Sequence, residues 1–313
     1  MATLELKNIL NSGAIQRSEE FDSSLERIPC GSQLSSGIKI DLSPFTEELI
    51  EERLSSRSKR IFEKLMYNMN NWEETFYHSL AASFGFRINA HPFEALARSI
   101  PLSMFGKQKG NRFHAEALLF GQSGMLSRKF EEAYPKKMRK EYAYLSKKHT
   151  LTPDHSFLWK FLRMRPSNFP TIRISQFAGL MVHQTGLFSV LLEAGTVNEL
   201  HSVFETGVSD YWEEHYVFGQ RTKRQKKILG RSAIDSLIIN LAVPFLFAYG
   251  RSRAEKQFVE RSIRFLHTIT AEDNSILRHW NKLGFACEDA FRSQALLELK
   301  KITAIGKDVL IAR

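Results

Sequence analysis

The apolar residues that follow Pro44 recur every three or four positions, which is the spacing of one face of an amphipathic helix. Ser43 can cap such a helix and Pro44 suits its first position, where no amide hydrogen is needed. Asn71 with Glu74 three residues later has the capping-box pattern of a second helix, which Gly85 can end. The apolar positions of the first helix are Phe45, Leu49, Ile50, Leu54, Ile61, Phe62, Leu65 and Met66, and those of the second are Phe76, Leu80 and Phe84.

Helical spacing continues to the end of the chain, and almost no stretch alternates apolar and polar residues as a half-buried strand does. We therefore predict an all-α fold, an irregular multi-helix array. No fixed repeat period is found, so a regular two-helix solenoid is not indicated, while an irregular solenoid stays open. Further helices are expected near 91–99, 112–123, 130–148, 155–163, 172–183, 187–193, 196–205, 232–248, 254–268, 273–283 and 288–304.

The first forty residues differ from the rest, because they are rich in Ser and Gly and contain one short strand candidate, Thr3–Lys7. We predict a short non-helical N-terminal segment over 1–42, interpreted as the remnant edge of a missing domain. A helical domain is expected over 43–313, with a subdivision near 150 or 220–231.

The chain has 313 residues, of which 43% are hydrophobic, so it can bury a substantial core. Its formal charge of +10 is uneven: residues 1–100 hold 11 Lys and Arg against 14 Asp and Glu, which leaves 33 against 20, or +13, for the rest. Such a basic surface favours nucleic acid, an anionic membrane surface or an acidic protein as a partner, although many basic proteins are simply soluble.

Two cysteines, Cys30 and Cys287, exclude a disulfide framework and favour a reducing, cytoplasmic location. No membrane partner is expected. The most apolar stretch, 237–248, is shorter than the roughly 18 to 20 residues that a membrane span needs, and it contains Asn240 and Pro244.

The segment 159–176, called the basic elbow below, places cations around an Asn between two prolines. Pro166 and Pro170 push the residues before them toward extended conformations, so Pro166 to Phe169 are expected to form a rigid elbow. Guanidinium groups match phosphate oxygens in pairs, and a fixed turn has little freedom left to lose on binding. The elbow is therefore a candidate nucleic-acid or anion-binding groove lined by Lys160, Arg163, Arg165, Asn168, Arg173 and Gln176.

The same arginines could instead be structural, since arginines often join helices through buried carboxylates. Glu116, Glu193 and Glu213 are then the expected partners of Arg163. Glu116 is an acid amid otherwise apolar helix positions and needs a partner when buried, and we expect that partner to be an arginine of the elbow. On this interpretation the protein is a helical protein-interaction scaffold without a ligand.

A second basic segment, Arg221–Arg231, contains no acid and is the largest local positive charge of the chain. We call it the basic run and expect a solvent-exposed loop. A solvated connection has this composition, and so does a phosphate-backbone contact, where each neutralised phosphate releases a counterion. The candidate phosphate-binding residues of the run are Arg221, Lys223, Arg224, Lys226 and Lys227.

Several blocks of this sequence resemble the uncharacterised bacterial family called domain of unknown function 2851. They are N-N-W-E-E-T-F-Y (70–77), F-G-F-R-I-N-A (84–90), E-A-L-L-F-G-Q-S-G (116–124), W-K-F-L-R-M-R-P-S-N-F-P-T-I-R (159–173), Y-W-E-E-H-Y-V-F-G (211–219), V-P-F-L-F-A-Y-G (243–250) and S-Q-A-L-L-E-L-K (293–300).

The resemblance implies two departures of this chain from the family pattern. Family members begin with a further strand-rich region whose acidic motif distantly resembles restriction-endonuclease-like cores, and this chain is expected to lack it. The family pattern also ends in clustered cysteines where this chain has Ala304, Val309 and Ala312, while Cys30 matches another family cysteine. One remaining thiol cannot form a four-sulfur site, so we expect no metal, and Cys30 is expected to be a buried or partly buried small apolar residue.

No H-E-x-x-H, H-x-H, nucleotide loop or nucleophile elbow occurs in the sequence. An enzymatic site would have to use Glu74, His78 one helical turn later, and Glu116, and would require all three to converge in one cleft. We lean against an enzyme and expect no cofactor. The favoured hypothesis is a nucleic-acid-associated helical module that binds phosphates through the elbow and the basic run, accessory to a nuclease-like region absent from this chain. The helical scaffold is the alternative.

Overall fold

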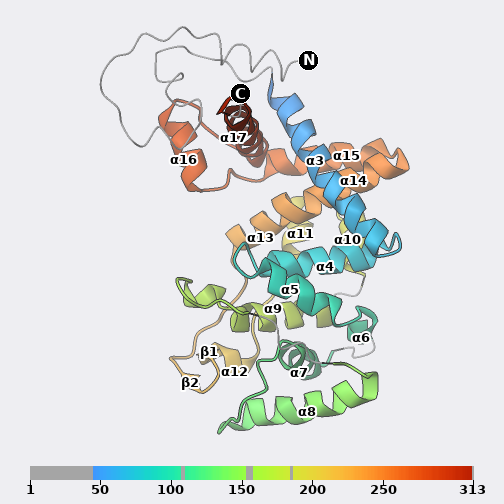
Figure 1. The fold of residues 1–313 in the computed structure, drawn as a ribbon, viewed down its shortest axis with the longest axis vertical. Coiled ribbons are helices and arrows are strands. Elements are labelled where there is room, and N and C mark those ends of the chain that lie inside the picture. The colour runs from blue at the N-terminus through green and yellow to red at the C-terminus, as the bar shows by residue number, and fades with distance from the viewer. Residues whose placement is uncertain (1–44, 107–109, 153–157, 184–185, 312–313) are drawn as a thin grey trace. The chain divides into compact units, whose positions relative to one another are not determined.

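The computed structural model describes residues 45–106, 110–152, 158–183 and 186–311, with side chains as far as Ile302 (Figure 1). The fold is all-α, as predicted, apart from one small antiparallel strand pair. The elements are α3 (Thr46–Tyr67), α4 (Trp72–Phe84), α5 (Ala90–Arg98), α6 (Ser103–Gly106), α7 (Arg112–Gln122), α8 (Ala133–His149), the 3₁₀ turn η3 (Pro166–Asn168), α9 (Pro170–His183), α10 (Leu187–Glu193), α11 (Val197–Phe204), α12 (Asp210–Glu213), β1 (His215–Val217), β2 (Gln220–Arg221), α13 (Arg231–Leu237), the π-helical turn η4 (Ile238–Ala242), α14 (Val243–Arg253), α15 (Lys256–Thr268), α16 (Ser275–Lys282) and α17 (Ala290–Ile311).

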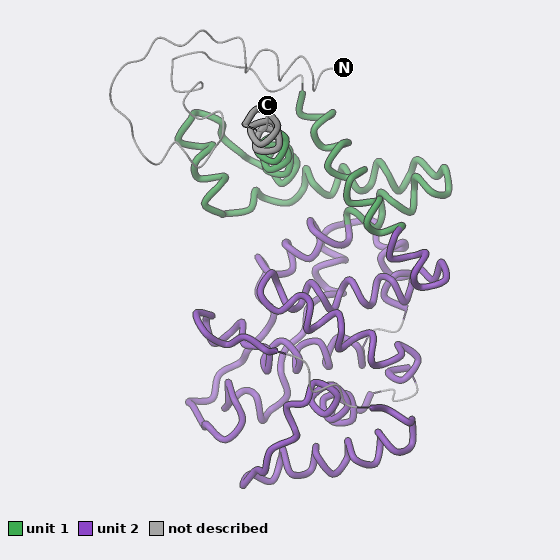
Figure 2. Tube along the Cα trace, in the orientation of Figure 1, with its two compact units in different colours: residues 1–62, 243–313 green, residues 63–242 purple. Residues whose placement is uncertain are grey.

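The chain divides into two compact units (Figure 2). Unit 1 comprises residues 1–62 and 243–313, and unit 2 comprises residues 63–242. The expected subdivision near 150 or 220–231 stays a prediction. The expected N-terminal segment 1–42, with its strand candidate and Cys30, lies outside the described residues.

Within unit 1, α15 packs against α14 and α17, and α16 packs against α17. Arg53 joins α3 to α17, because its Nε donates to Gln294 Oε1 (2.7 Å) and its Nη1 lies 3.0 Å from Glu298 Oε2. The carboxylate of Glu298 is almost fully buried, so this ion pair fixes the two helices in register.

Unit 2 contains both basic segments, and its centre is α9. That helix packs against α4, α7 and strand β1, while α4 also packs against α5 and α7 against α8. The predicted cap of α4 is confirmed, because the Asn71 side chain accepts a hydrogen bond from the backbone N–H of Glu74 (3.0 Å). The close approach of α7 to α8 depends on Gly121, where a Cβ atom would lie 2.0 Å from the ring of Tyr142.

The predicted helix 155–163 is wrong for its described residues, since 158–161 have no regular secondary structure and 162–164 form a turn and bend. A tertiary contact overrides the local helical pattern. The side chain of Asn89 donates to the carbonyl of Lys160 and accepts from its N–H, both at 2.9 Å, so Lys160 cannot use these groups in a helix. The short α6, α12 and the β1–β2 hairpin had no sequence signal that we recognised.

The predicted helix 232–248 is interrupted by the π-helical turn η4 and continues to Arg253. Pro244 explains the interruption, because it has no N–H to donate to Asn240 and its ring crowds that carbonyl. The expectation of no membrane partner stays a prediction. In the described residues, the helical stretch Arg231–Arg253 is long and apolar enough to span a membrane, although 72% of its most apolar window is buried inside the structure, as it is in core helices of proteins that do not span membranes.

Candidate nucleic-acid interface

The predicted elbow is present. Residues 166–168 form the 3₁₀ turn η3, and both residues before the prolines are extended, with φ −65° and ψ 140° at Arg165 and φ −58° and ψ 144° at Phe169. Helix α9 then begins at Pro170. The chain therefore changes direction between two conformationally restricted residues, which limits the orientations that the elbow side chains can adopt.

The segment that leads into the elbow is fixed to the body of unit 2. Asn89 holds the backbone of Lys160 through two hydrogen bonds, and Trp159 Nε1 donates to the carbonyl of Ser123 (3.0 Å). The Trp159 ring also packs edge-on against Phe93, with 5.2 Å between the ring centroids. These contacts place the elbow cations on a pre-organised surface, so ordering them on binding costs little.

The elbow exposes three cations, Lys160, Arg163 and Arg165. Within the described part of the chain none of the three forms an ion pair. Two of the three expected partners of Arg163 have other roles, since Glu116 pairs with Arg112 and Glu213 with Arg224. The third, Glu193, forms no ion pair with a described residue. The sequence itself contains no Asp or Glu between Asp154 and Glu193. The exposed positive charge of the elbow is therefore not neutralised locally.

Arg173 is buried, with 6% of its surface exposed, and it is held by neutral groups. Its Nη1 donates to Gln176 Oε1 (3.0 Å), its Nη2 donates to Asn168 Oδ1 (2.6 Å), and its guanidinium lies 4.4 Å from the centre of the Phe86 ring. Nε has no hydrogen-bond partner in the described residues. Burial lowers the pKa of Arg173 to about 10.

The N-terminus of α9 adds further positive potential behind the elbow. The residue before the helix is Phe169, which has no side-chain acceptor to cap it. Among the described residues, no acceptor is found for the backbone N–H groups of Thr171 and Ile172, although Arg173 N donates to Phe169 O (3.0 Å). Free N–H groups at a helix start carry the positive end of the helix dipole. Arg173 and the N-terminus of α9 thus both add positive electrostatic potential at the elbow.

The basic run differs from the expected exposed loop at Lys227, which is buried. Its Nζ donates to the carbonyls of Trp212 (2.5 Å) and His215 (2.9 Å) and lies 3.8 Å from the centre of the Tyr216 ring. Burial lowers the pKa of Lys227, and Glu213 opposes that shift. Leu229, two residues later, is also buried, and this apolar residue was the available sequence signal that the chain turns inward here, whereas Ile228 between them is exposed.

The other members of the run are exposed but not equivalent. Arg221 pairs with Glu214 (2.8 Å), and Arg224 pairs with Glu213 (2.7 Å) and Asp210 (3.5 Å). Lys223 and Lys226 are exposed and form no ion pair with any described residue. The run is attached to α9, because Gln176 Nε2 donates to Lys227 O (3.1 Å). Strand β1, which precedes the run, is attached to the same helix, because Thr171 Oγ1 donates to Tyr216 O (2.5 Å). The two predicted basic segments therefore meet on one helix.

The cation that compensates Glu116 is Arg112 of the same helix, and not an arginine of the elbow as predicted. Glu116 is fully buried, and its Oε1 lies 3.4 Å from Arg112 Nε. Three hydroxyl groups complete its hydrogen bonds: Ser175 Oγ (2.6 Å), Tyr134 Oη (2.6 Å) and Ser209 Oγ (3.0 Å). The spacing of Arg112 and Glu116, four residues apart on one helix, was the sequence signal for this pair.

Of the three residues of the enzymatic hypothesis, Glu116 is fully buried and therefore does not line a solvent-reachable cleft. His78 Nε2 lies 3.4 Å from Glu74 Oε1, but in the described residues no hydrogen bond or ion pair joins either of them to Glu116. No group of three or more His, Cys, Asp or Glu residues in the described parts of the chain could hold a metal ion. The expected absence of a metal and a cofactor stays a prediction.

Glu132 fixes the β1–β2 hairpin that leads into the basic run. Its carboxylate accepts from Tyr211 Oη and from Gly219 N (3.2 Å), and His215 Nε2 lies 3.1 Å from its Oε1. Burial alone would raise the pKa of Glu132, but the hydrogen bonds from Tyr211, His215 and Gly219 together lower it below its ordinary value.

We expect Glu132→Gln to reduce the dependence of stability on pH in mildly acidic solution. A carboxyl whose pKa is lower in the folded state contributes stability that is complete above its unfolded pKa and is lost as the pH falls through its folded pKa. Urea unfolding at about pH 7 and about pH 3.5 should show a smaller loss of unfolding free energy for the variant than for the wild type. An equal loss in both proteins would contradict this role of Glu132.

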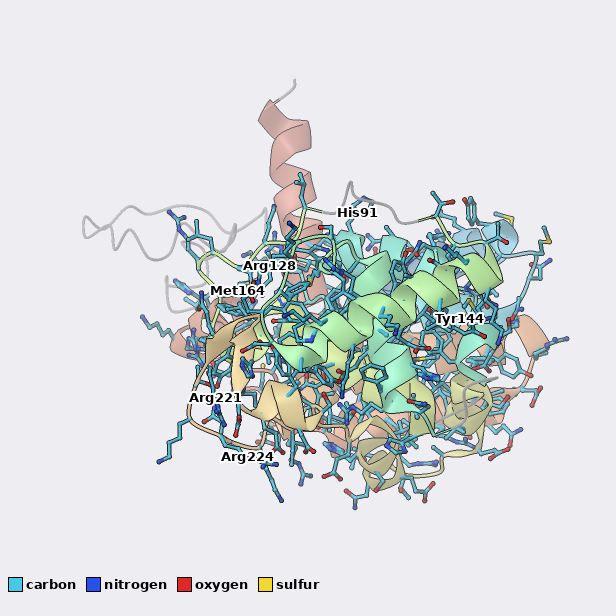
Figure 3. All side chains as sticks on the ribbon, turned by 90° about the horizontal axis from the view of Figure 1, so that it is seen from below. His91, Arg128, Tyr144, Met164, Arg221 and Arg224 are labelled. Atoms are coloured by element: carbon cyan, nitrogen blue, oxygen red, sulfur yellow. The ribbon has the colours of Figure 1, made fainter. Side chains whose placement is uncertain are left out.

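Figure 3 views the structure from below relative to Figure 1 and labels side chains of unit 2. Met164 of the elbow and Arg221 and Arg224 of the run lie toward the same side of this view, while Tyr144 on α8 lies toward the other side. Tyr144 is exposed on α8, on the other side of this view from the elbow, and Lys148 Nζ lies 5.7 Å from the centre of its ring.

The structure thus defines a basic, all-α protein with an acid-free elbow on its larger unit. The chain belongs to the family described as "Protein of unknown function (DUF2851)", whose model matches residues 1–275. The match includes the elbow and the basic run, whereas the block at 293–300 lies beyond it. Neither a curated protein nor a solved structure matches the chain.

Proposed function

We propose that unit 2 binds the phosphates of a nucleic acid through the basic elbow. The observation that carries this proposal is the set of exposed cations Lys160, Arg163 and Arg165, which are held on a rigid segment and have no carboxylate partner in the described residues. In a protein whose surface charges are structural, such arginines are usually paired with acids. Here an external polyanion is the natural partner.

The buried Arg173 increases the positive electrostatic potential of the elbow. The charge of Arg173 is compensated by two amide oxygens and a ring, and not by an acid. Uncompensated charge near a surface of low dielectric acts over longer distances than a paired charge. A phosphate chain would release one condensed counterion for about each cation that it meets, which favours binding at low salt.

The residues of the basic run contribute unequally to this function. Lys223 and Lys226 are exposed and unpaired with any described acid, so they extend the phosphate path. Arg221 and Arg224 already pair with acids and add little net charge. Lys227 and Gln176 connect the run to α9 from inside. We propose that this module acts as an accessory to a nuclease-like region of the kind that the family resemblance implies.

A helical protein-interaction scaffold is the second candidate. It is favoured by the structural roles of Arg112 and Lys227, whose charged groups bind a buried carboxylate and buried carbonyls. The scaffold hypothesis gives no reason for three unpaired cations on one fixed segment, which is why nucleic-acid binding is preferred.

Titration of a fluorescent single-stranded oligonucleotide, followed by anisotropy, tests the proposal. Wild-type protein should bind at low salt, and Arg165→Ala should weaken binding by about threefold to tenfold while leaving the helical signal unchanged. The matched control is Arg278→Ala, which removes an exposed arginine of unit 1 that pairs with Asp273 and should have no effect. Absence of binding at low salt, or equal losses in the two variants, would overturn the proposal.

A further inference from the structure

We infer that the elbow takes single-stranded nucleic acid and discriminates against a duplex, an inference that rests on the proposed function. Two leucines stand among its cations with most of their surface in solvent: Leu158 is 81% exposed and Leu162 is 83% exposed. Ile88, on the segment that binds Lys160, is 47% exposed. Apolar and cationic groups therefore share one surface.

The apolar groups and the cations are close because of the chain itself. Leu162 and Arg163 are the central residues of a turn closed by a hydrogen bond from Met164 N to Phe161 O (3.4 Å). Lys160 is only two residues away, and consecutive Cα atoms are about 3.8 Å apart. Ile88 precedes Asn89, whose side chain holds the backbone of Lys160 at 2.9 Å. The two leucines are therefore within a few residues of the elbow cations along the chain, and Ile88 is next to the residue that binds Lys160.

The turn holds its residues in a costly conformation. Arg163 has a φ of 61°, which lies in the left-handed region that favours glycine and asparagine. Glycine at this position would adopt the same positive φ without strain. Strain of this kind is frequent at binding sites, where the surrounding contacts fix a side chain in its binding position. Arg163 and the neighbouring Leu162 are therefore displayed together.

A single strand fits this surface better than a duplex does. Duplex DNA presents phosphates on its outside and keeps the faces of its bases stacked, so it would meet the cations and leave the leucines in water. A single strand exposes the faces of its bases as well as its phosphates. Bases can then cover Leu158 and Leu162 while adjacent phosphates bind the guanidinium groups, and the planar guanidinium of an arginine can itself stack on a base.

An anionic membrane surface would also bind cations and leucines, but the aromatic residues of this segment argue against it. Tryptophan and other aromatic residues anchor proteins at a lipid interface. Trp159 instead donates its N–H to the carbonyl of Ser123, and Phe161 packs edge-on against Phe169 with 5.2 Å between the centroids. The aromatic groups of the segment are engaged within the protein, and its most exposed apolar side chains are the aliphatic Leu158 and Leu162.

The test compares a single-stranded oligonucleotide, its duplex and anionic phospholipid vesicles on the full chain. The double variant Leu158→Ser with Leu162→Ser should lose about tenfold in affinity for the single strand, with an unchanged salt dependence, and much less for the duplex. Tyr144→Ser is the control, because Tyr144 is also exposed, at 59%, and lies away from the elbow (Figure 3). Both leucines are exposed, so circular dichroism should show unaltered folding.

The outcomes separate this inference from the function on which it rests. Tighter binding of the single strand, lost specifically in the leucine variant, supports the inference. Equal affinity for strand and duplex, or a leucine variant that binds the strand as tightly as wild type, overturns it while phosphate binding stands. Vesicle binding that depends on the leucines, without nucleic-acid binding, overturns both.

Discussion

Replacing Arg112 with Met will lower the free energy of unfolding by about 3 to 5 kcal/mol, because it removes the cation beside a fully buried carboxylate. Arg112 also donates from Nη2 to the carbonyls of Ser175 (3.0 Å) and Gly207 (2.5 Å), so its loss leaves these oxygens without that donor. Three hydroxyl groups would still bind Glu116, but a hydroxyl group does not neutralise its charge.

Replacing Arg173 with Met will alter the free energy of unfolding by about 1 kcal/mol or less. Two opposing effects nearly cancel. The substitution leaves Gln176 Oε1 without the donor at 3.0 Å, which costs about 1 to 3 kcal/mol for a buried oxygen. It also removes the cost of burying a charge that no acid compensates, and that cost is evident from the lowered pKa of Arg173.

Urea unfolding of the two variants, followed by circular dichroism, measures the difference directly. Both substitutions replace arginine with the same side chain in the same unit, so each controls for the other. If Arg173→Met destabilised the protein as much as Arg112→Met, the guanidinium of Arg173 would be a structural strut. The scaffold hypothesis would then be favoured over nucleic-acid binding.

The second large effect concerns binding. Arg163→Glu with Arg165→Glu should reduce the affinity for single-stranded nucleic acid by on the order of 100-fold at low salt, because two attractive contacts become repulsive. The control is Arg251→Glu with Arg253→Glu on α14 of unit 1. Both of these arginines are exposed, and the pair changes the net charge of the protein by the same amount. The control variant should bind nearly as well as wild type.

The sequence predicted the parts of the site that depend on local geometry. The two prolines fixed the extended conformations of Arg165 and Phe169, and the pattern of Asn71 with Glu74 predicted the cap of α4. The bounds of most helices were also predicted within a few residues, because each helix packs an apolar side against the core and this gives its sequence a helical spacing of apolar residues. These features depend on residues that are neighbours along the chain.

Contacts between distant segments could not be predicted in the same way. The non-helical start of the elbow is fixed by Asn89, which is 71 residues away from Lys160. The burial of Lys227 depends on carbonyl groups of Trp212 and His215 that the hairpin brings beneath it. The positive φ of Arg163 likewise follows from how its turn is held and not from its residue type. Each of these features needs the tertiary structure.

The central claim is that the exposed guanidinium groups of the elbow meet phosphates. The most direct measurement is the salt dependence of single-strand binding for the wild type, the elbow charge-reversal variant and the α14 control. A phosphate contact contributes about 0.7 to the slope of log K against log salt for a single strand, so losing two should reduce the magnitude of the slope by about 1.4 in the elbow variant alone. Equal slopes in all three proteins, with equal losses of affinity in the two variants, would show that only net charge matters and would contradict the claim.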